Sequence, residues 1–269
     1  MNILILGDIM GPSGRKAIIE KLPDLIKKQK LDFVIVNGEN AADPGVGITK
    51  KNIEDFIKAG ADVITTGNHV WDQKETMEII TNEKRLLRPE NLTKGSPGNG
   101  YGVYNSKNKK RVAVINLMGN IFMKKCEDVF EAAQKFIKSI QLKIDADFIV
   151  VDIHGEITSE KMAMGHFLDG KATMVVGTHT HVPTSDYRIL EKGTAYQTDI
   201  GMCGDYNSVI GMNKDNSLKK FLKDSSATKH YPALGEATIS GLMVVADNKT
   251  GLANKVEPIV LGGSLKNTI

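Results

Sequence analysis

The chain has 269 residues, 41% of them hydrophobic, and a formal net charge of +3 at pH 7. This length and apolar content allow a full buried core. No linker, repeat or low-complexity tract divides the chain, so we expect one domain over residues 1–269. The basic residues are spread along the sequence without interleaved aromatic residues, which argues against a nucleic-acid surface.

The sequence also bears on the cell compartment. The N-terminal segment becomes polar too early for a signal peptide or a membrane span, so we expect a cytoplasmic protein with no membrane partner. Cys126 and Cys203 lie far apart and outside any Cys-x-x-Cys pattern. Neither a zinc site nor a disulfide framework is therefore indicated, and buried free thiols are expected.

The N-terminal part of the chain predicts strands that alternate with helices. Apolar, β-branched runs predict three buried strands, at residues 2–7, 33–37 and 62–66. Apolar residues at helical spacing predict helices over 14–29 and 51–59, and Pro23 inside the first predicts a kink or a helix restart. The connections are long enough for the three strands to be parallel.

The same alternation continues beyond a loop at 94–102 and then changes character. Strands are predicted at 111–117, 147–152 and 173–177, and helices at 129–142 and 159–167. The segments that alternate like antiparallel strands are 186–190, 194–198, 238–246 and 255–261. We therefore expect an α/β fold, a four-layer α/β/β/α sandwich of two mixed sheets. The antiparallel segments argue against a TIM barrel, which would also fit the length.

Residues 201–235 show no clear period. A structureless loop of that length is uncommon in a compact domain. The segment is therefore either functional, as a lid or a subunit contact, or it contains an element that the pattern does not reveal.

Four runs of metal-binding side chains directly follow predicted strands. They are Gly7-Asp8, Gly38-Glu39-Asn40, Gly67-Asn68-His69 and Gly177-Thr178-His179-Thr180-His181. His154 follows the strand at 147–152 in the same way, with Asp152 as a partner that could orient it. Ligands of open α/β sheets bind at the carboxyl ends of the strands. Together these carboxylates, amides and imidazoles suffice for two adjacent divalent ions, which points to metal-assisted hydrolysis of a phosphate ester.

Each run by itself has a structural alternative. Asp8 could cap the following helix. Asn68 could lie at the centre of a turn, beside a His69 whose ring nitrogens have hydrogen-bond partners within the fold. His179 and His181 are two residues apart, so an extended backbone would place both rings on the same side, as two neighbouring metals require. The clustering at strand ends favours the metal site, because four of the six histidines fall there and only His166 and His230 do not.

The runs resemble those of the YmdB-like branch of the calcineurin-like metallophosphoesterases. The runs that carry the resemblance are Gly7-Asp8-Ile9-Met10-Gly11, Asn37-Gly38-Glu39-Asn40-Ala41-Ala42, Gly45-Val46-Gly47-Ile48-Thr49, Thr66-Gly67-Asn68-His69-Val70-Trp71, Asp152-Ile153-His154, Gly177-Thr178-His179-Thr180-His181 and Thr198-Asp199-Ile200-Gly201-Met202. Three positions depart from the wider superfamily and match this branch: Met10 replaces a His, Glu39 replaces an Asp, and Thr178 is inserted before His179. The resemblance covers essentially the whole chain.

The resemblance implies a site and an activity. It implies an α/β/β/α sandwich, two divalent metal ions, with iron as first choice and manganese or zinc as alternatives, and phosphodiesterase activity toward 2′,3′-cyclic nucleotides. The ligands it implies for the first ion are Asp8, Glu39, Asn40 and His181. Those for the second are Glu39, Asn68, His154 and His179. His69 resembles the proton donor.

The implied ligand count allows a mechanism. Four protein ligands on each ion leave positions for substrate oxygens and for a bridging hydroxide that attacks phosphorus. The net charge of such a site would be positive and would suit a small phosphodiester monoanion.

Two other functions remain open from the sequence. One is a broader phosphatase or nuclease with the same site, and the other is a regulatory nucleotide-sensing protein with incidental turnover. RNA ends as substrates and a homo-oligomeric state are also left open.

Overall fold

The computed structural model describes residues 1–269 and contains two sheets of six strands each. The first sheet has the order β12 (Ala253–Leu261), β11 (Ile239–Ala246), β1 (Asn2–Ile9), β2 (Phe33–Asn37) and β3 (Val63–Thr65), with β10 (Met202–Cys203) paired to β1. The second has the order β4 (Tyr101–Asn105), β5 (Arg111–Met118), β6 (Phe148–His154), β7 (Met174–Thr178), β9 (Ala195–Gln197) and β8 (Arg188–Ile189).

Both sheets are mixed, as the sequence predicted. The strands β1, β2 and β3 are parallel to one another, and so are β5, β6 and β7. Later strands add antiparallel pairs, because β11 runs antiparallel to β1 and to β12, and β8 runs antiparallel to β9. The carboxyl ends of the parallel strands therefore share one edge in each sheet.

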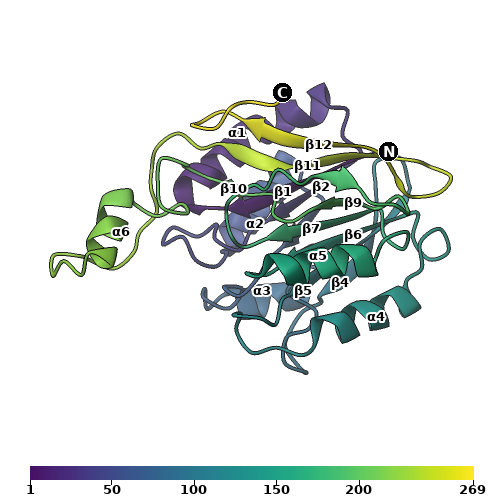
Figure 1. Ribbon diagram of the computed structural model, residues 1–269, viewed down its shortest axis with the longest axis horizontal. Coiled ribbons are helices and arrows are strands. Elements are labelled where there is room, and N and C mark those ends of the chain that lie inside the picture. Colours follow the sequence, from purple (N-terminus) through teal and green to yellow (C-terminus); the bar gives the residue numbers. More distant parts are fainter.

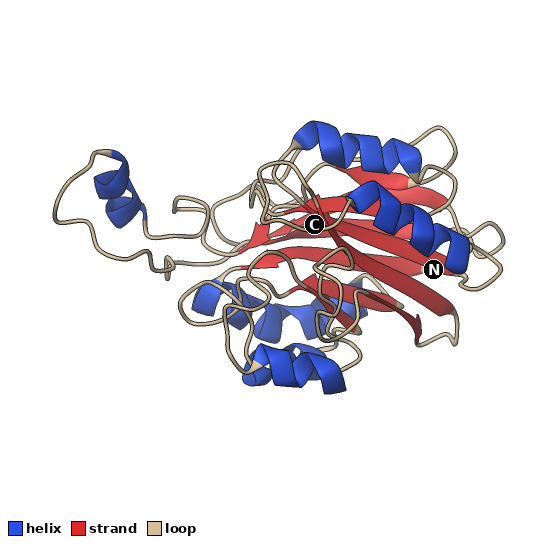
Figure 2. Ribbon diagram, turned by 90° about the horizontal axis from the view of Figure 1, so that it is seen from below, coloured by secondary structure: helices blue, strands red, loops and turns tan.

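The helices lie outside the two sheets. They are α1 (Gly11–Lys28), α2 (Lys50–Ala59), α3 (Thr76–Asn82), α4 (Val129–Ser139), α5 (Thr158–Phe167) and α6 (Lys214–Phe221). Figure 2 shows the strands between two layers of helices, and Figure 1 places α4 and α5 beside the second sheet. None of the six helices combines the length and the apolar run that a membrane crossing requires.

Three buried apolar clusters correspond to the three contacts between four layers. Alternate residues of β1 divide between two of them, because Leu4 and Leu6 face α1 and α2 whereas Ile3 and Ile5 face the other sheet. The third cluster joins the second sheet to α4 and α5. The predicted four-layer α/β/β/α sandwich is thus confirmed.

The sequence analysis was wrong at several elements. Helix α1 continues through Pro23, so of the predicted kink or restart the restart is excluded; Leu22 and Leu25 on either side are buried and hold that turn against the first sheet. Helix α4 ends at Ser139, three residues before its predicted end. Helix α3 and strand β4 were not predicted, and residues 201–235 contain β10 and α6.

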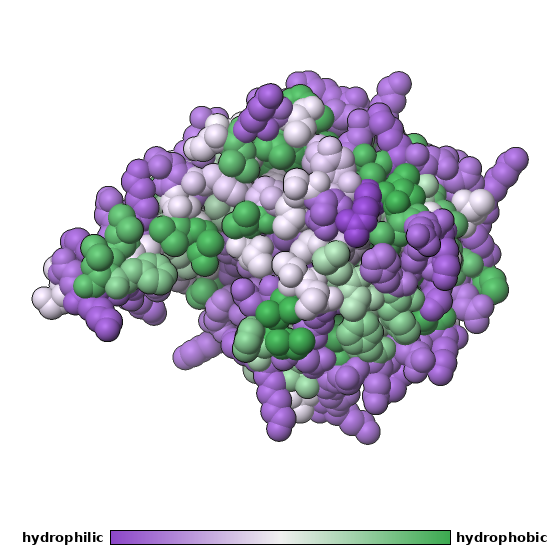
Figure 3. Space-filling view, in the orientation of Figure 1, coloured by the Kyte–Doolittle hydropathy of each residue, from purple (hydrophilic) through white to green (hydrophobic).

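Helix α6 belongs to an arm, residues 205–236, that extends away from the two sheets (Figure 1). Apolar side chains gather on the surface of the arm in Figure 3, and its exposed apolar residues include Phe221 and Leu222. The root of the arm is closed where Asp205 Oδ2 accepts a hydrogen bond from the Gly235 amide at 2.9 Å. Both cysteines are free, and Cys203 is buried as expected whereas Cys126 is only partly so.

Candidate metal centre

The inter-sheet faces of the parallel strands change from apolar to polar at their carboxyl ends. Because side chains alternate along a strand, each polar group faces the same way as the core residue two positions before it. The pairs are Ile35 and Asn37 on β2, Val63 and Thr65 on β3, Val150 and Asp152 on β6, and Val176 and Thr178 on β7. On β1, a register shift between Leu6 and Asp8 breaks this alternation just before Asp8.

A buried hydrogen-bond network lies immediately below the edge. Asp152 Oδ2 accepts from Thr65 Oγ1 at 2.5 Å and from Asn37 Nδ2 at 3.1 Å, and Asp152 Oδ1 accepts from Thr178 Oγ1 at 2.8 Å. Burial raises the pKa of Asp152 to about 7, against the opposing effect of these hydrogen bonds. The network fixes the strand ends on which the candidate ligands lie.

This network also orients His154. Thr178 Oγ1 lies 2.9 Å from His154 Nδ1. The single hydroxyl proton of Thr178 is given to Asp152, so the hydroxyl accepts from Nδ1–H and leaves the lone pair on Nε2. Burial lowers the pKa of His154 to about 4, which keeps the ring neutral at pH 7. Its Nε2 is therefore available as a metal ligand.

Three other predicted ligands converge around His154 Nε2. Glu39 Oε1 lies 3.0 Å from it, His179 Nδ1 lies at 3.1 Å and Asn68 Oδ1 at 3.2 Å. Burial lowers the pKa of His179 to about 3, so this ring is neutral as well. Glu156, which the sequence analysis did not single out, lies 3.2 Å from the far nitrogen of His179. That contact leaves His179 Nδ1 to face the cluster.

The remaining predicted ligands lie beside this group. Asn40 Nδ2 is 3.0 Å from His181 Nε2, and His181 Nδ1 donates to the carbonyl of Ile210 on the arm at 2.8 Å. Asp8 is fully buried, and burial raises its pKa. Its Oδ2 accepts from the His179 amide at 3.1 Å, and its Oδ1 lies 3.6 Å from His154 Nδ1.

The donor atoms of this group fit a divalent cation. Of the six buried side-chain nitrogen and oxygen atoms without a hydrogen-bond partner, four are here: Asp8 Oδ1, both Glu39 carboxylate oxygens and Asn40 Oδ1. Burial raises the pKa of Glu39 to about 7, because a dry carboxylate without a partner is costly. A carboxylate oxygen that faces an imidazole lone pair is favourable only when a cation binds to both.

Gly67 makes room for this arrangement. A Cβ atom at this position would lie 1.8 Å from Glu39 Oε2 and 2.2 Å from His154 Cδ2. Any side chain there would displace both residues. The glycine before Asn68 is therefore required by close approach.

His69 is oriented by Asp72. Its Nδ1 is 2.6 Å from Asp72 Oδ2, and the side chain is about one-third exposed. Lys124 Nζ lies 3.8 Å from Asp72 Oδ1 and donates to the Asn68 carbonyl at 2.6 Å. Sequence reasoning missed Asp72 and Lys124. The His-x-x-Asp spacing after Gly67-Asn68 was the only signal for Asp72.

The turn that carries His179 and His181 is not extended, contrary to the spacing argument. Strand β7 ends at Thr178, and both histidines have left-handed backbones, with φ of 99° and 66°. The two rings therefore reach separate partners, His154 and Asn40. The spacing argument gave the wrong reason for bringing both rings to the site.

A buried ion pair holds this turn. Lys161 Nζ donates to the Thr178 carbonyl at 2.7 Å and to Asp199 Oδ2 at 2.8 Å, and Asp199 Oδ2 also accepts from the Thr180 amide at 3.0 Å. Nothing in the sequence singled out Lys161, which lies inside a predicted helix. His166 and His230 are exposed and lie outside the cluster.

Two mixed sheets between helices, with candidate metal ligands at the strand ends, define a metallophosphoesterase-like fold. The sequence profile of the YmdB-like protein family matches residues 4–259, and the chain belongs to this family.

Two kinds of relatives support this assignment. The chain is 44% identical over 261 residues to the 2′,3′-cyclic-nucleotide 2′-phosphodiesterase of Bacillus subtilis strain 168, and this alignment covers 97% of each protein. A crystal structure described as a novel phosphatase from Mycoplasma pneumoniae aligns with a TM-score of 0.88 and 37% identity, over 97% of this chain and 93% of the other. A hypothetical protein from Thermus thermophilus aligns with a TM-score of 0.88 and 38% identity, over 97% of this chain and 99% of the other.

Proposed function

We propose that this chain is a metal-dependent phosphodiesterase that hydrolyses 2′,3′-cyclic nucleotides at a dinuclear site. The observation that carries the proposal is the group of four buried, unpartnered oxygens beside neutral imidazoles. The name of the Bacillus subtilis relative supports the substrate class. We also propose that residues 1–269 form one domain, since the central apolar cluster draws on both sheets.

We assign two ligand sets that share Glu39. The first consists of Asp8, Glu39, Asn40 and His181, and the second of Glu39, Asn68, His154 and His179. The convergence of three side chains on His154 Nε2 supports the second set, and the contact between Asn40 and His181 supports the first. Mixed imidazole, amide and carboxylate ligands favour iron, manganese or zinc over magnesium.

Divalent cations at such a site supply Lewis-acid polarisation of phosphoryl oxygens and a lowered pKa of water. The chain supplies proton transfer through His69. Asp72 holds His69 Nδ1, which leaves Nε2 free to face a substrate. Water adds to phosphorus and loses a proton to solvent, the bond from phosphorus to one ribose oxygen breaks, and that oxygen takes a proton from His69 Nε2. Solvent then returns a proton to His69.

The proposal is tested by comparing three substrates under one metal condition. We expect kcat/KM to be highest for 2′,3′-cyclic AMP, lower for adenosine monophosphate and lowest for single-stranded RNA. A chelator should abolish turnover, and added Mn²⁺ or Fe²⁺ should restore it. A preference for the monophosphate would favour a phosphatase, the function named for the Mycoplasma pneumoniae structure, and would overturn the proposal.

RNA ends and a homo-oligomer gain no support from the relatives and form no part of this proposal. A regulatory sensor would be favoured by tight nucleotide binding without turnover in the metal-loaded protein.

A further inference from the structure

The loop of residues 119–124, which follows β5, is attached at both ends to residues of the proposed site. At its start, the Gly119 amide donates to the carbonyl of His154 at 3.0 Å. At its end, Lys124 Nζ donates to the carbonyl of Asn68 at 2.6 Å. The residues between these two anchors are therefore held at the rim of the metal centre.

The base of the loop is fixed by hydrogen bonds of Asn120. The Asn120 amide donates to Glu160 Oε1 at 2.9 Å, and Glu160 is only 7% exposed. The Asn120 side chain bonds to the backbone at both Val129 and Glu127, each at 2.9 Å. The position of the loop is thus set by its base and by Lys124.

The tip presents an aromatic ring to solvent. Phe122 is 84% exposed, which is the highest value among the large hydrophobic residues of the chain. Its backbone has φ of 60°, in the left-handed region that a non-glycine residue rarely adopts. Neither its exposure nor its backbone conformation helps the fold, and this combination is typical of functional positions.

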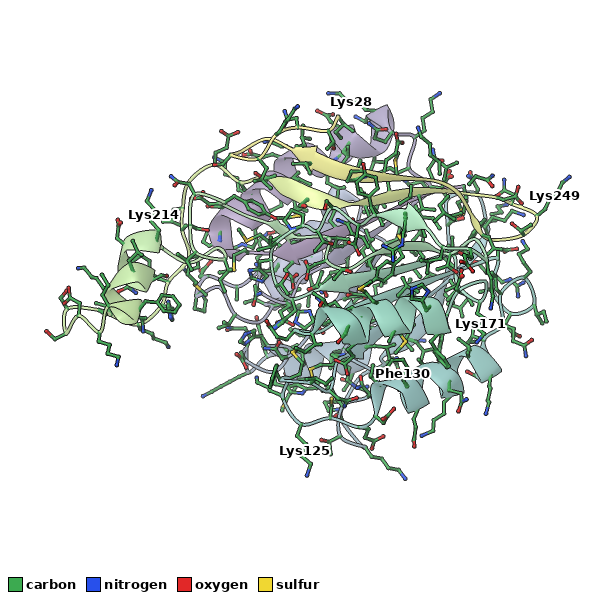
Figure 4. The ribbon with its side chains drawn as sticks, viewed as in Figure 1. Lys28, Lys125, Phe130, Lys171, Lys214 and Lys249 are labelled. Atoms are coloured by element: carbon green, nitrogen blue, oxygen red, sulfur yellow. The ribbon has the colours of Figure 1, made fainter.

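We propose that Phe122 is a nucleobase-binding residue that stacks on the base of the substrate. This inference rests on the proposed function and names the part of the substrate that the metal centre does not bind. Phe122 lies two residues from Lys124, so their Cα atoms are at most about 8 Å apart. Two residues of backbone and one lysine side chain therefore separate the Phe122 Cα from the Asn68 carbonyl at the metal centre. Lys125, by contrast, points away from the body of the protein (Figure 4).

Base stacking on an exposed ring requires no hydrogen bond to the base, because every base presents a π-face. The inference therefore predicts that affinity depends on the presence of a base more than on its identity. Purines, with the larger ring system, should bind more tightly than pyrimidines.

The test compares a nucleotide with a base-free analogue in the manganese-loaded protein. For Phe122→Ala, KM for 2′,3′-cyclic AMP should rise roughly 5- to 150-fold, the range that corresponds to stacking of one base on one aromatic ring. KM for a methyl riboside 2,3-cyclic phosphate should not change. Phe122→Trp should keep the wild-type KM for both substrates.

The chain offers a matched control in Phe221. Its ring is 80% exposed and lies on α6, away from the sheets. Phe221→Ala should leave KM unchanged for both substrates. An equal rise of KM for the nucleotide and the base-free substrate with Phe122→Ala would overturn the inference, and so would no rise at all.

A binding measurement separates this inference from the proposed function. Titration calorimetry with adenosine 3′-monophosphate needs no turnover and should show weaker binding to Phe122→Ala than to wild type or Phe221→Ala. Unchanged binding would overturn the nucleobase role even if the enzyme hydrolyses cyclic nucleotides. Weakened binding in a protein that hydrolyses no cyclic phosphate would support the nucleobase role and overturn the proposed function.

Discussion

Replacement of Lys161 by methionine should destabilise the protein strongly. Lys161 and Asp199 have side-chain exposures of 0% and 1%, and their charged atoms are 2.8 Å apart. Without the lysine, the Asp199 carboxylate keeps only the backbone donors of Thr180 and Gly201 in a dry environment. Breaking such a buried pair costs about 3–5 kcal/mol, because the remaining charge is buried without a counter-ion.

Removal of the Asp199 charge as well should recover part of the stability that Lys161→Met loses. In Lys161→Met with Asp199→Asn, no uncompensated charge remains, so the double variant should be more stable than Lys161→Met by about 0.5–3 kcal/mol, the usual coupling between contacting residues. Asp199→Asn alone keeps a hydrogen-bond acceptor but leaves the Lys161 charge buried without a counter-ion, so it should also destabilise the protein.

Urea unfolding of the metal-free protein measures these free energies. One cooperative transition is expected if residues 1–269 form one domain. Lys171→Met is the matched control, since Lys171 is exposed near the end of α5 (Figure 4). Its ammonium group contacts only Phe167, so its loss should change the free energy of unfolding by less than about 1 kcal/mol.

Two results would refute this reasoning. One is a loss below about 1 kcal/mol for Lys161→Met, the typical effect of an ordinary substitution. The other is a double variant whose loss equals the sum of the two single losses, since contacting charges must be coupled. Manganese titration of the folded variants should also show weaker binding, because the pair holds the turn that carries His179 and His181.

Three further predictions concern the site itself. Glu39→Gln should weaken both metals, because one carboxylate is proposed to serve two ions; retention of two metals per chain after dialysis, with normal turnover, would contradict the shared role. His69→Ala should keep the metals and slow turnover roughly 10²–10⁴-fold. The loss should shrink for a nitrophenyl diester, and an equal loss with both leaving groups would exclude a proton donor. Gly67→Ala should abolish metal binding with an unchanged circular dichroism spectrum, since its Cβ would lie 1.8 Å from Glu39 Oε2. Gly155→Ala is the control and should bind metal normally, because its Cβ would meet nothing nearer than 3.5 Å.

The layers and the parallel strands could be predicted because buried strands and amphipathic helices have clear periods. The missed elements lack such periods. Helix α3 buries only Thr76 and Ile80, and α6 buries only Asn216 and Ser217, so neither has an apolar stripe. Strand β4 lies at a sheet edge with no fully buried residue, and its alternation is too weak to distinguish it from a loop.

The candidate ligands could be predicted because each lies at the end of a strand or just after it, and strand ends meet at a sheet edge whatever the details of packing. The residues that position them could not. Lys161 lies in a helix, where a lysine is usually solvated, and its burial depends on tertiary packing alone. The partner of His181 Nδ1 is the backbone carbonyl of Ile210. Every residue has a backbone carbonyl, so the sequence cannot indicate which one acts as the acceptor.

The left-handed turn at His179 and His181 carries two candidate ligands and is held both by another candidate ligand, Asp8, and by a positioning residue, Asp199. A left-handed backbone at a non-glycine residue is unfavourable by itself and persists only where neighbouring groups hold it. Here Asp199 accepts from the Thr180 amide, and Asp8 Oδ2 accepts from the His179 amide. Asp8 thus positions the histidines with one oxygen while its other oxygen has no hydrogen-bond partner. If Asp8 binds metal as proposed, the first ligand of the chain also sets the geometry of the last two.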